Sequence, residues 1–196
     1  MNKLVLSFVF CFFTLCFSFS QENGNKQNTF IGINPAVSLT VGCLSTIMDP
    51  NTTYIPIHIV ANHSFSKHFG LSGLLMYRLE KDNAFKTNEI GFAVGPSYLS
   101  NELNGFYADL KLGIGLAAGQ NNLSEDYTRM DLIIQPDIGF FKKFSSGFAL
   151  SLGLGIQSLV KISENPSREG VWEWNKTGKF SHYYLPVLNI SLGYAF

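Results

Sequence analysis

Serine and histidine side chains near the end of the sequence are the first candidates for chemistry. Ser181, His182 and the more distant Ser158 are residue types that hydrolases use as nucleophile and general base. Neighbours in a strand point to opposite faces, so Ser181 and His182 cannot readily pair within one. The sequence also lacks the G-x-S-x-G and H-E-x-x-H patterns. We therefore expect no catalytic residues.

Cofactor and metal binding have equally little support. The stretch GIGLAAG at 113–119 has the glycines of a phosphate-binding loop, but no helical pattern follows it and its glycines fall on one face of an alternating segment. His63 and His68 flank an expected turn beside Lys67, where solvated side chains are more typical than metal ligands. We expect neither a cofactor nor a metal ion.

Charged residues in the alternating segments all fall on one face. These seven residues are Arg78, Glu89, Asp109, Lys111, Arg129, Asp131 and Asp137, three basic and four acidic. Charges enclosed by a small barrel need partners. We expect an interior network of ion pairs and hydrogen bonds, in which Arg78 lies near Glu89 and Lys111 pairs with Asp109 or Asp137. Small inward residues, Gly113, Gly115, Gly153 and Gly155, leave room for these long side chains.

Eight segments carry this alternation of apolar and polar residues. They are residues 29–41, 53–62, 70–79, 88–99, 105–117, 127–140, 147–160 and 182–196. Strands of about 5 or 6 residues are usual in soluble sheets, whereas a strand that crosses a bilayer needs about 9 to 11. The connections SFSKHF, SNELN and KKFSS are short, and they alternate with mostly longer, polar ones. We predict an all-β fold, a closed eight-stranded antiparallel up-and-down transmembrane β-barrel.

Aromatic residues of the predicted strands gather at two depths. Tyr98, Phe106, Phe140, Phe148, Tyr194 and Phe196 lie toward the short turns. Tyr54, Tyr77, Tyr127, Trp172, Trp174, Phe180, Tyr183 and Tyr184 lie toward the long loops. Two aromatic belts with an aliphatic zone between them mark the two interfaces of a membrane barrel.

The first twenty residues have the pattern of a cleaved signal peptide. Lys3 precedes an apolar run at 4–19, and Ser18-Phe19-Ser20 forms a small-x-small cleavage site. The run is shorter than the roughly 20 residues of a membrane-spanning helix. We expect a signal peptide at 1–20, a short polar segment at 21–28 and a barrel domain at 29–196. Cys11 and Cys16 leave with the signal, so Cys43 has no internal disulfide partner.

The mature chain, from about residue 28 to 196, resembles the outer-membrane β-barrel families of two-membrane bacteria, in particular the eight-stranded OmpA/OmpX-like class. The most specific part is the ending LGYAF, in which Leu192, Tyr194 and Phe196 are similar to the C-terminal assembly signal of those proteins. The resemblance implies a monomeric barrel in the lipid of the cell outer membrane, with the barrel-assembly machinery as a partner.

Function is expected to reside in the loops. Residues 161–179 contain Arg168, Trp172 and Trp174, which could extend the aromatic belt or form a patch for adhesion to extracellular surfaces or ligands. We expect a structural or surface-interaction protein with a side-chain-filled interior. The alternatives are a small-solute channel or a lipid A-modifying enzyme on the same barrel, or a soluble lipocalin-like ligand-binding barrel with its apolar face inward. Acidic and basic residues balance at 14 each, so we expect no nucleic-acid partner.

Overall fold

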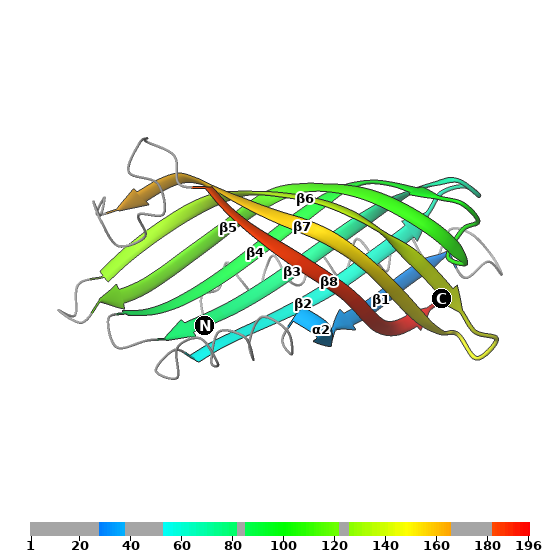
Figure 1. The fold of residues 1–196 in the computed structure, drawn as a ribbon, viewed down its shortest axis with the longest axis horizontal. Coiled ribbons are helices and arrows are strands. Elements are labelled where there is room, and N and C mark those ends of the chain that lie inside the picture. Colours follow the sequence, from blue (N-terminus) through cyan, green and yellow to red (C-terminus); the bar gives the residue numbers. More distant parts are fainter. Residues whose placement is uncertain (1–27, 38–52, 82–84, 122–125, 166–181) are drawn as a thin grey trace.

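A computed structural model describes residues 28–37, 53–81, 85–121, 126–165 and 182–196 of the 196-residue chain. The strands are β1 (Thr29–Asn34), β2 (Thr53–Ser64), β3 (Phe69–Lys81), β4 (Phe85–Leu99), β5 (Gly105–Asn121), β6 (Asp126–Lys143), β7 (Phe148–Asn165) and β8 (His182–Ala195). They form a closed barrel in chain order, with β1 pairing antiparallel to β8 (Figure 1). The prediction of an all-β fold with eight antiparallel strands is confirmed.

Alternation of side chains explains why these segments form one wall. Along β6, Ile133, Gln135 and Asp137 are buried, whereas Pro136 and Ile138 between and beside them are exposed. Because successive side chains of a strand point to opposite faces, the buried set fills the barrel and the other set covers its outside. The outward set is apolar, and Ile138 is 66% exposed.

Short turns and the described chain ends lie at the same end of the barrel, which we call the turn end. The turns are residues 65–68, 100–104 and 144–147. The backbone N–H of Thr29 donates to the carbonyl of Phe196 at 3.0 Å, and the N–H of Phe196 donates back to Thr29 at 2.8 Å. The opposite end, which we call the loop end, lies at the left of Figure 1.

The outward aromatic residues at the turn end form the expected belt. Of the six predicted residues, Tyr98, Phe106, Phe140, Phe148 and Tyr194 are exposed, and the rings of Phe106 and Phe140 lie 5.5 Å apart. Phe196 is only partly exposed, and Phe69, which was not predicted, is exposed at the same end. At the loop end the prediction was wrong for two residues. Tyr127 is buried, with its hydroxyl bonded to that of Thr87, and Tyr54 lies on the inward face, where its hydroxyl accepts from Arg78 at 3.5 Å. Both belong to the inward phase of their strands.

The first strand is shorter than predicted. We expected an extended segment at 29–41, but β1 ends at Asn34, and α2 (Pro35–Val37) follows it. Val37, expected on the outward face, is buried. Proline has no N–H to donate to a neighbouring strand, and so it favours the end of a strand here. Residues 38–41 lie outside the described part. Within the described ranges, no helix is long and apolar enough to cross a membrane.

The side chain of Asn34 continues the β1–β8 ladder where the strand itself stops. Its Nδ2 donates to the carbonyl of Leu188 and its Oδ1 accepts from the N–H of Ile190, both at 3.3 Å. Oδ1 also accepts from the N–H of Ala36 at 3.1 Å, and Nδ2 donates to Oδ1 of Asn189 at 2.8 Å. A carboxamide has the donor and acceptor of a peptide group, so Asn34 replaces one step of backbone pairing on β8.

Replacing Asn34 with Ala should therefore lower the stability of the barrel by about 1–3 kcal/mol, because buried backbone groups of β8 and α2 lose their partner. Chemical denaturation of the refolded protein measures the change. The control is Asn88→Ala, which removes an exposed hydrogen bond to Tyr77 and should change stability by less than about 0.5 kcal/mol. Equal effects of the two substitutions would contradict the role given to Asn34.

Candidate functional site

Charged side chains inside the barrel form two groups, and the first lies toward the loop end. This loop-end cluster consists of Arg78 on β3, Glu89 on β4, and Arg129 and Asp131 on β6. Arg78 and Glu89 are register partners, and their side chains form an ion pair at 2.5 Å. Arg129 contacts the other oxygen of Glu89 at 3.3 Å and Oδ2 of Asp131 at 2.8 Å. Two cations and two anions give this cluster a formal charge of zero.

Lys111 is the centre of the second group. Its ammonium lies 2.5 Å from Oδ2 of Asp137 and 3.0 Å from Oδ2 of Asp109. Asp109 and Asp137 are direct cross-strand partners on β5 and β6, an arrangement in which two like charges repel. Lys111 bridges them, so the sequence-based pairing with either aspartate becomes a pairing with both. All three residues are buried.

Neutral donors complete the Lys111 cluster. The Ser97 hydroxyl donates to Asp109, Gln135 Nε2 donates to Asp137 Oδ2 at 2.9 Å, and Asn189 Nδ2 donates to Asp137 Oδ1 at 2.6 Å. One cation and two anions leave a formal charge of −1, so these hydrogen bonds to the carboxylates carry part of the compensation. Gly155 leaves the space that Asp137 occupies, because a Cβ at this position would collide with the Asp137 carboxylate.

An apolar layer separates the two clusters. Ile133 lies between Asp131 and Gln135 on the inward face of β6, and Ile133 and Met76 both reach the space above Gly91. Gln157 crosses this layer, donating to Gln135 at 2.9 Å and to the sulfur of Met76 at 3.6 Å. The charged interior expected as one network is therefore two networks, each compensated locally.

Aromatic side chains fill the interior at the turn end. Phe30 and Tyr107 both pack on Phe141, with ring centroids 5.4 and 4.8 Å apart. Leu99 and Leu103 are buried with them, and we call these five residues the turn-end plug. Sequence analysis missed the plug, although Phe30 and Phe141 are in phase with the inward residues of β1 and β6.

The histidines are placed apart from one another. His58 is buried inside β2, and its Nδ1 has no hydrogen-bond partner among the described residues. His63 Nδ1 is bonded to the Thr29 hydroxyl at 2.8 Å, and His68 Nδ1 lies 3.1 Å from the Leu99 carbonyl. In the described ranges, no three His, Cys, Asp or Glu residues are grouped so that they could hold a metal ion.

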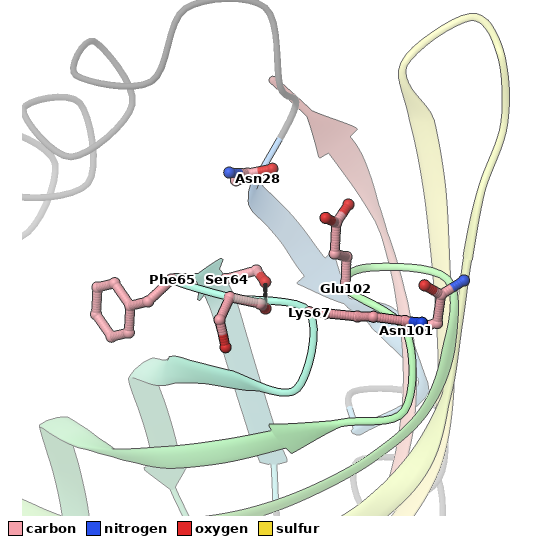
Figure 2. Close-up of a pocket in the computed structure, with 7 residues that line it drawn as sticks. Asn28, Ser64, Phe65, Lys67, Asn101 and Glu102 are labelled. Carbon is pink, nitrogen blue, oxygen red and sulfur yellow. Dashed lines mark hydrogen bonds between the residues drawn. The ribbon is translucent and has the colours of Figure 1, made fainter.

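A cavity of about 380 Å³ opens at the turn end, outside the plug. It is lined by Asn28, Ser64, Phe65, Ser66, Lys67, Asn101 and Glu102 (Figure 2). The Glu102 N–H donates to the Lys67 carbonyl at 2.9 Å, which joins the two turns, and Glu102 adopts a φ of 46°. The lining combines one carboxylate and one ammonium with amides, hydroxyls and one aromatic ring.

Several residues predicted to have functional roles lie outside the clusters, the plug and the cavity. Arg168, Trp172, Trp174, Ser181, Cys43 and the signal peptide at 1–20 lie outside the described residues. Leu192 and Tyr194 are exposed on the outward face of β8, and Phe196 pairs with Thr29 through its backbone. The chain matches no protein-family model, no curated protein and no solved structure.

Replacing Lys111 with Met should destabilise the barrel by about 3–5 kcal/mol, since it leaves two opposed carboxylates buried without their cation. Asp137→Asn in the same chain should restore part of that loss, because one of the two repelling charges is removed. Denaturant unfolding of the single and double variants measures the coupling.

Lys161→Met is the matched control for this lysine. Lys161 forms an ion pair with Glu164 at 2.9 Å, but the two side chains are 24% and 13% exposed. Because Lys161 meets a single carboxylate and both side chains keep some contact with solvent, its loss should cost less than the loss of Lys111. A Lys111→Met protein as stable as the Lys161→Met protein would show that Lys111 does not hold the two aspartates together.

Proposed function

We propose that this chain is an integral β-barrel protein of the outer membrane of a two-membrane bacterium. The observation that supports this proposal is the inverted polarity of the barrel. Seven ionisable side chains of the two clusters point inward, whereas large apolar side chains such as Phe106 and Leu154 are 70% and 63% exposed on the outside. A protein surrounded by water gains nothing from this arrangement, whereas a protein surrounded by hydrocarbon requires it.

Closure of the sheet supports the same proposal. A bilayer core offers no water to unpaired N–H and C=O groups, so strands can cross it only when every strand has two neighbours. Strands β2 to β8 have 12 to 18 residues, long enough to cross. The expected signal peptide at 1–20 provides the route of export.

A soluble lipocalin-like barrel does not fit the side chains that point into and out of this barrel. A lipocalin-like barrel that binds an apolar ligand would place the apolar face inside and the charges in water. Here Lys111, Asp109 and Asp137 are buried inside, and the leucines and isoleucines of the other phase are outside. This contrast favours the membrane protein over the soluble carrier.

We also propose a structural or surface-interaction role over transport and catalysis. The turn-end plug and the Lys111 cluster occupy successive levels of the interior, which argues against a wide aqueous passage. His182, the histidine considered for a lipid A-modifying enzyme, begins β8, and its side chain lies outside the described part. Single-channel conductance in a planar bilayer is the measurement that separates a filled barrel from a small-solute channel.

Partners follow from the same proposal. The outward-facing Leu192 and Tyr194 of β8, with Phe196, are the residues through which the barrel-assembly machinery would recognise the chain. Outer-membrane lipid surrounds the wall of a monomeric barrel. The segment with Arg168, Trp172 and Trp174 would meet extracellular surfaces or ligands.

Membrane integration is the direct test. The protein expressed in a two-membrane bacterium should remain in the membrane pellet after alkaline extraction. It should also migrate faster on a detergent gel when unheated than when boiled, because the folded barrel stays compact. A protein that is soluble without detergent and shows no heat-dependent mobility would overturn the proposal.

The loop prediction has its own test. Replacing Trp172 and Trp174 together with Ala should abolish adhesion of expressing cells to extracellular matrix or to other cells, because aromatic anchors dominate binding surfaces. Replacing outward Phe106 with Ala is the control, since it removes an exposed aromatic residue at the turn end. Unchanged adhesion in the double variant, with normal heat-dependent mobility, would remove these tryptophans from any binding surface.

A further inference from the structure

Of the three short turns described, the β4–β5 turn at 100–104 is the one that sends an apolar side chain into the barrel. Leu103 of this turn is 1% exposed and belongs to the turn-end plug. In the other two turns the apolar residues point away from the interior, and Phe65 and Phe144 are 57% and 43% exposed. The β4–β5 turn therefore covers the end of the interior as well as joining two strands.

Hydrogen bonds fix the two ends of this turn to each other. The backbone N–H of Ser100 donates to the Phe106 carbonyl at 2.7 Å, and the N–H of Phe106 donates to the Ser100 hydroxyl at 2.8 Å. Gly105 leaves room for that hydroxyl, because a Cβ at this position would lie 2.3 Å from it. Residues 101–104 lie between these fixed ends and outside the regular β4–β5 pairing, and we call them the lid.

The β2–β3 turn at 65–68 lies beside the lid and holds it in place (Figure 2). The N–H of Glu102 donates to the Lys67 carbonyl at 2.9 Å, and the N–H of Leu99, the last residue of β4, donates to the His68 carbonyl at 2.9 Å. Among the described residues, one backbone hydrogen bond thus ties the lid itself to the neighbouring turn. The lid can open without breaking any strand pairing.

The closed lid places Glu102 in a backbone conformation that most side chains disfavour. Its φ of 46° lies in the left-handed region, which is uncommon for residues other than glycine, asparagine and aspartate. This strain opposes closure, whereas the burial of Leu103 and the bond to Lys67 favour it. Opposing contributions within one short segment are what a segment with an open and a closed state requires.

The region behind the lid leads directly to buried charges. Tyr107 of the plug and Asp109 of the Lys111 cluster are successive inward residues of β5, about 7 Å apart along the strand. On β4, Leu99 of the plug is likewise followed inward by Ser97, whose hydroxyl donates to Asp109. The plug is therefore the layer between the lid and the Lys111 cluster.

We propose that residues 101–104 form a lid that opens and closes the turn end of the barrel interior. In the closed form Leu103 completes the plug, and in the open form Leu103 leaves it, so that water and small polar solutes reach the Lys111 cluster. Glu102 sets the balance between the two forms through its backbone. The inference concerns access to the interior and does not depend on the membrane location proposed above.

A thiol behind the plug measures lid opening. Ser151 is buried on β7, and its hydroxyl donates to that of Tyr107 at 3.3 Å, so Ser151→Cys places the thiol there. The refolded protein in detergent micelles is treated with a small charged methanethiosulfonate reagent, and modification at position 151 is followed by mass spectrometry of its peptide. Thr87→Cys, in a separate protein, reports access to the interior at the loop end.

Two substitutions of Glu102 form a matched pair, because both remove its carboxylate. Asparagine keeps the N–H and adopts positive φ readily, whereas proline lacks the N–H and fixes φ near −65°. Glu102→Pro should speed modification at position 151 at least tenfold, and Glu102→Asn should leave the rate unchanged or lower it. Leu103→Ala should also speed modification, since the side chain that completes the plug is shortened, and it provides the test if Glu102→Pro does not refold.

Two results would overturn the inference. The first is a rate of modification at position 151 that is the same in the proline, asparagine and Leu103→Ala variants as in the parent protein. The second is an equal acceleration at positions 151 and 87, because the substitutions would then have loosened the whole barrel and residues 101–104 would not move as a separate unit. Acceleration at position 151 alone supports the lid.

Discussion

Lys111 lies between two aspartates that face each other across neighbouring strands, and the interior is arranged to keep these three charges in contact. A closed wall of eight strands excludes most of the water that would otherwise screen them. The remaining lone pairs are therefore met by neutral donors from β4, β6 and β8. Gly155 has no side chain, and this leaves the space that the Asp137 carboxylate occupies. The interior thus depends on small residues as much as on charged ones.

Local compensation also explains the layering of the interior. The loop-end cluster balances its own charges, and the Lys111 cluster is completed by amides, so neither needs the other across the apolar layer of Met76 and Ile133. Separated clusters keep each charge within a few ångströms of its partner, where the interaction is strongest. The turn-end plug then fills the remaining length with aromatic rings, which carry no charge to compensate.

Much of the fold could be predicted because one pattern, alternation with period two, specifies the strands, their faces and the enclosed charges together. The pairing of Arg78 with Glu89 could be predicted because the two residues are equally far from the middle of the connection between β3 and β4, and an antiparallel hairpin places such residues opposite each other. The end of β1 could not be predicted, because the alternation continues from Ile31 to Val41 and a proline is no reliable stop signal in this chain. Other prolines lie within strands that continue past them, at positions 56, 136 and 186. The plug was missed because alternation gives the face of Phe30 and Phe141 but not the depth to which their rings reach.

The order of the strands around the barrel has a consequence for the way the chain folds. Seven of the strand pairs join neighbours in the sequence, so each can form as a hairpin soon after its residues are available. The pair β1–β8 joins opposite ends of the domain, and the entropy of closing so long a segment is lost before its contacts form. The strand that is synthesised first is consequently the last to gain its second neighbour. Until then its free edge is open to pairing with another chain, so this protein is most vulnerable to aggregation just before it is complete.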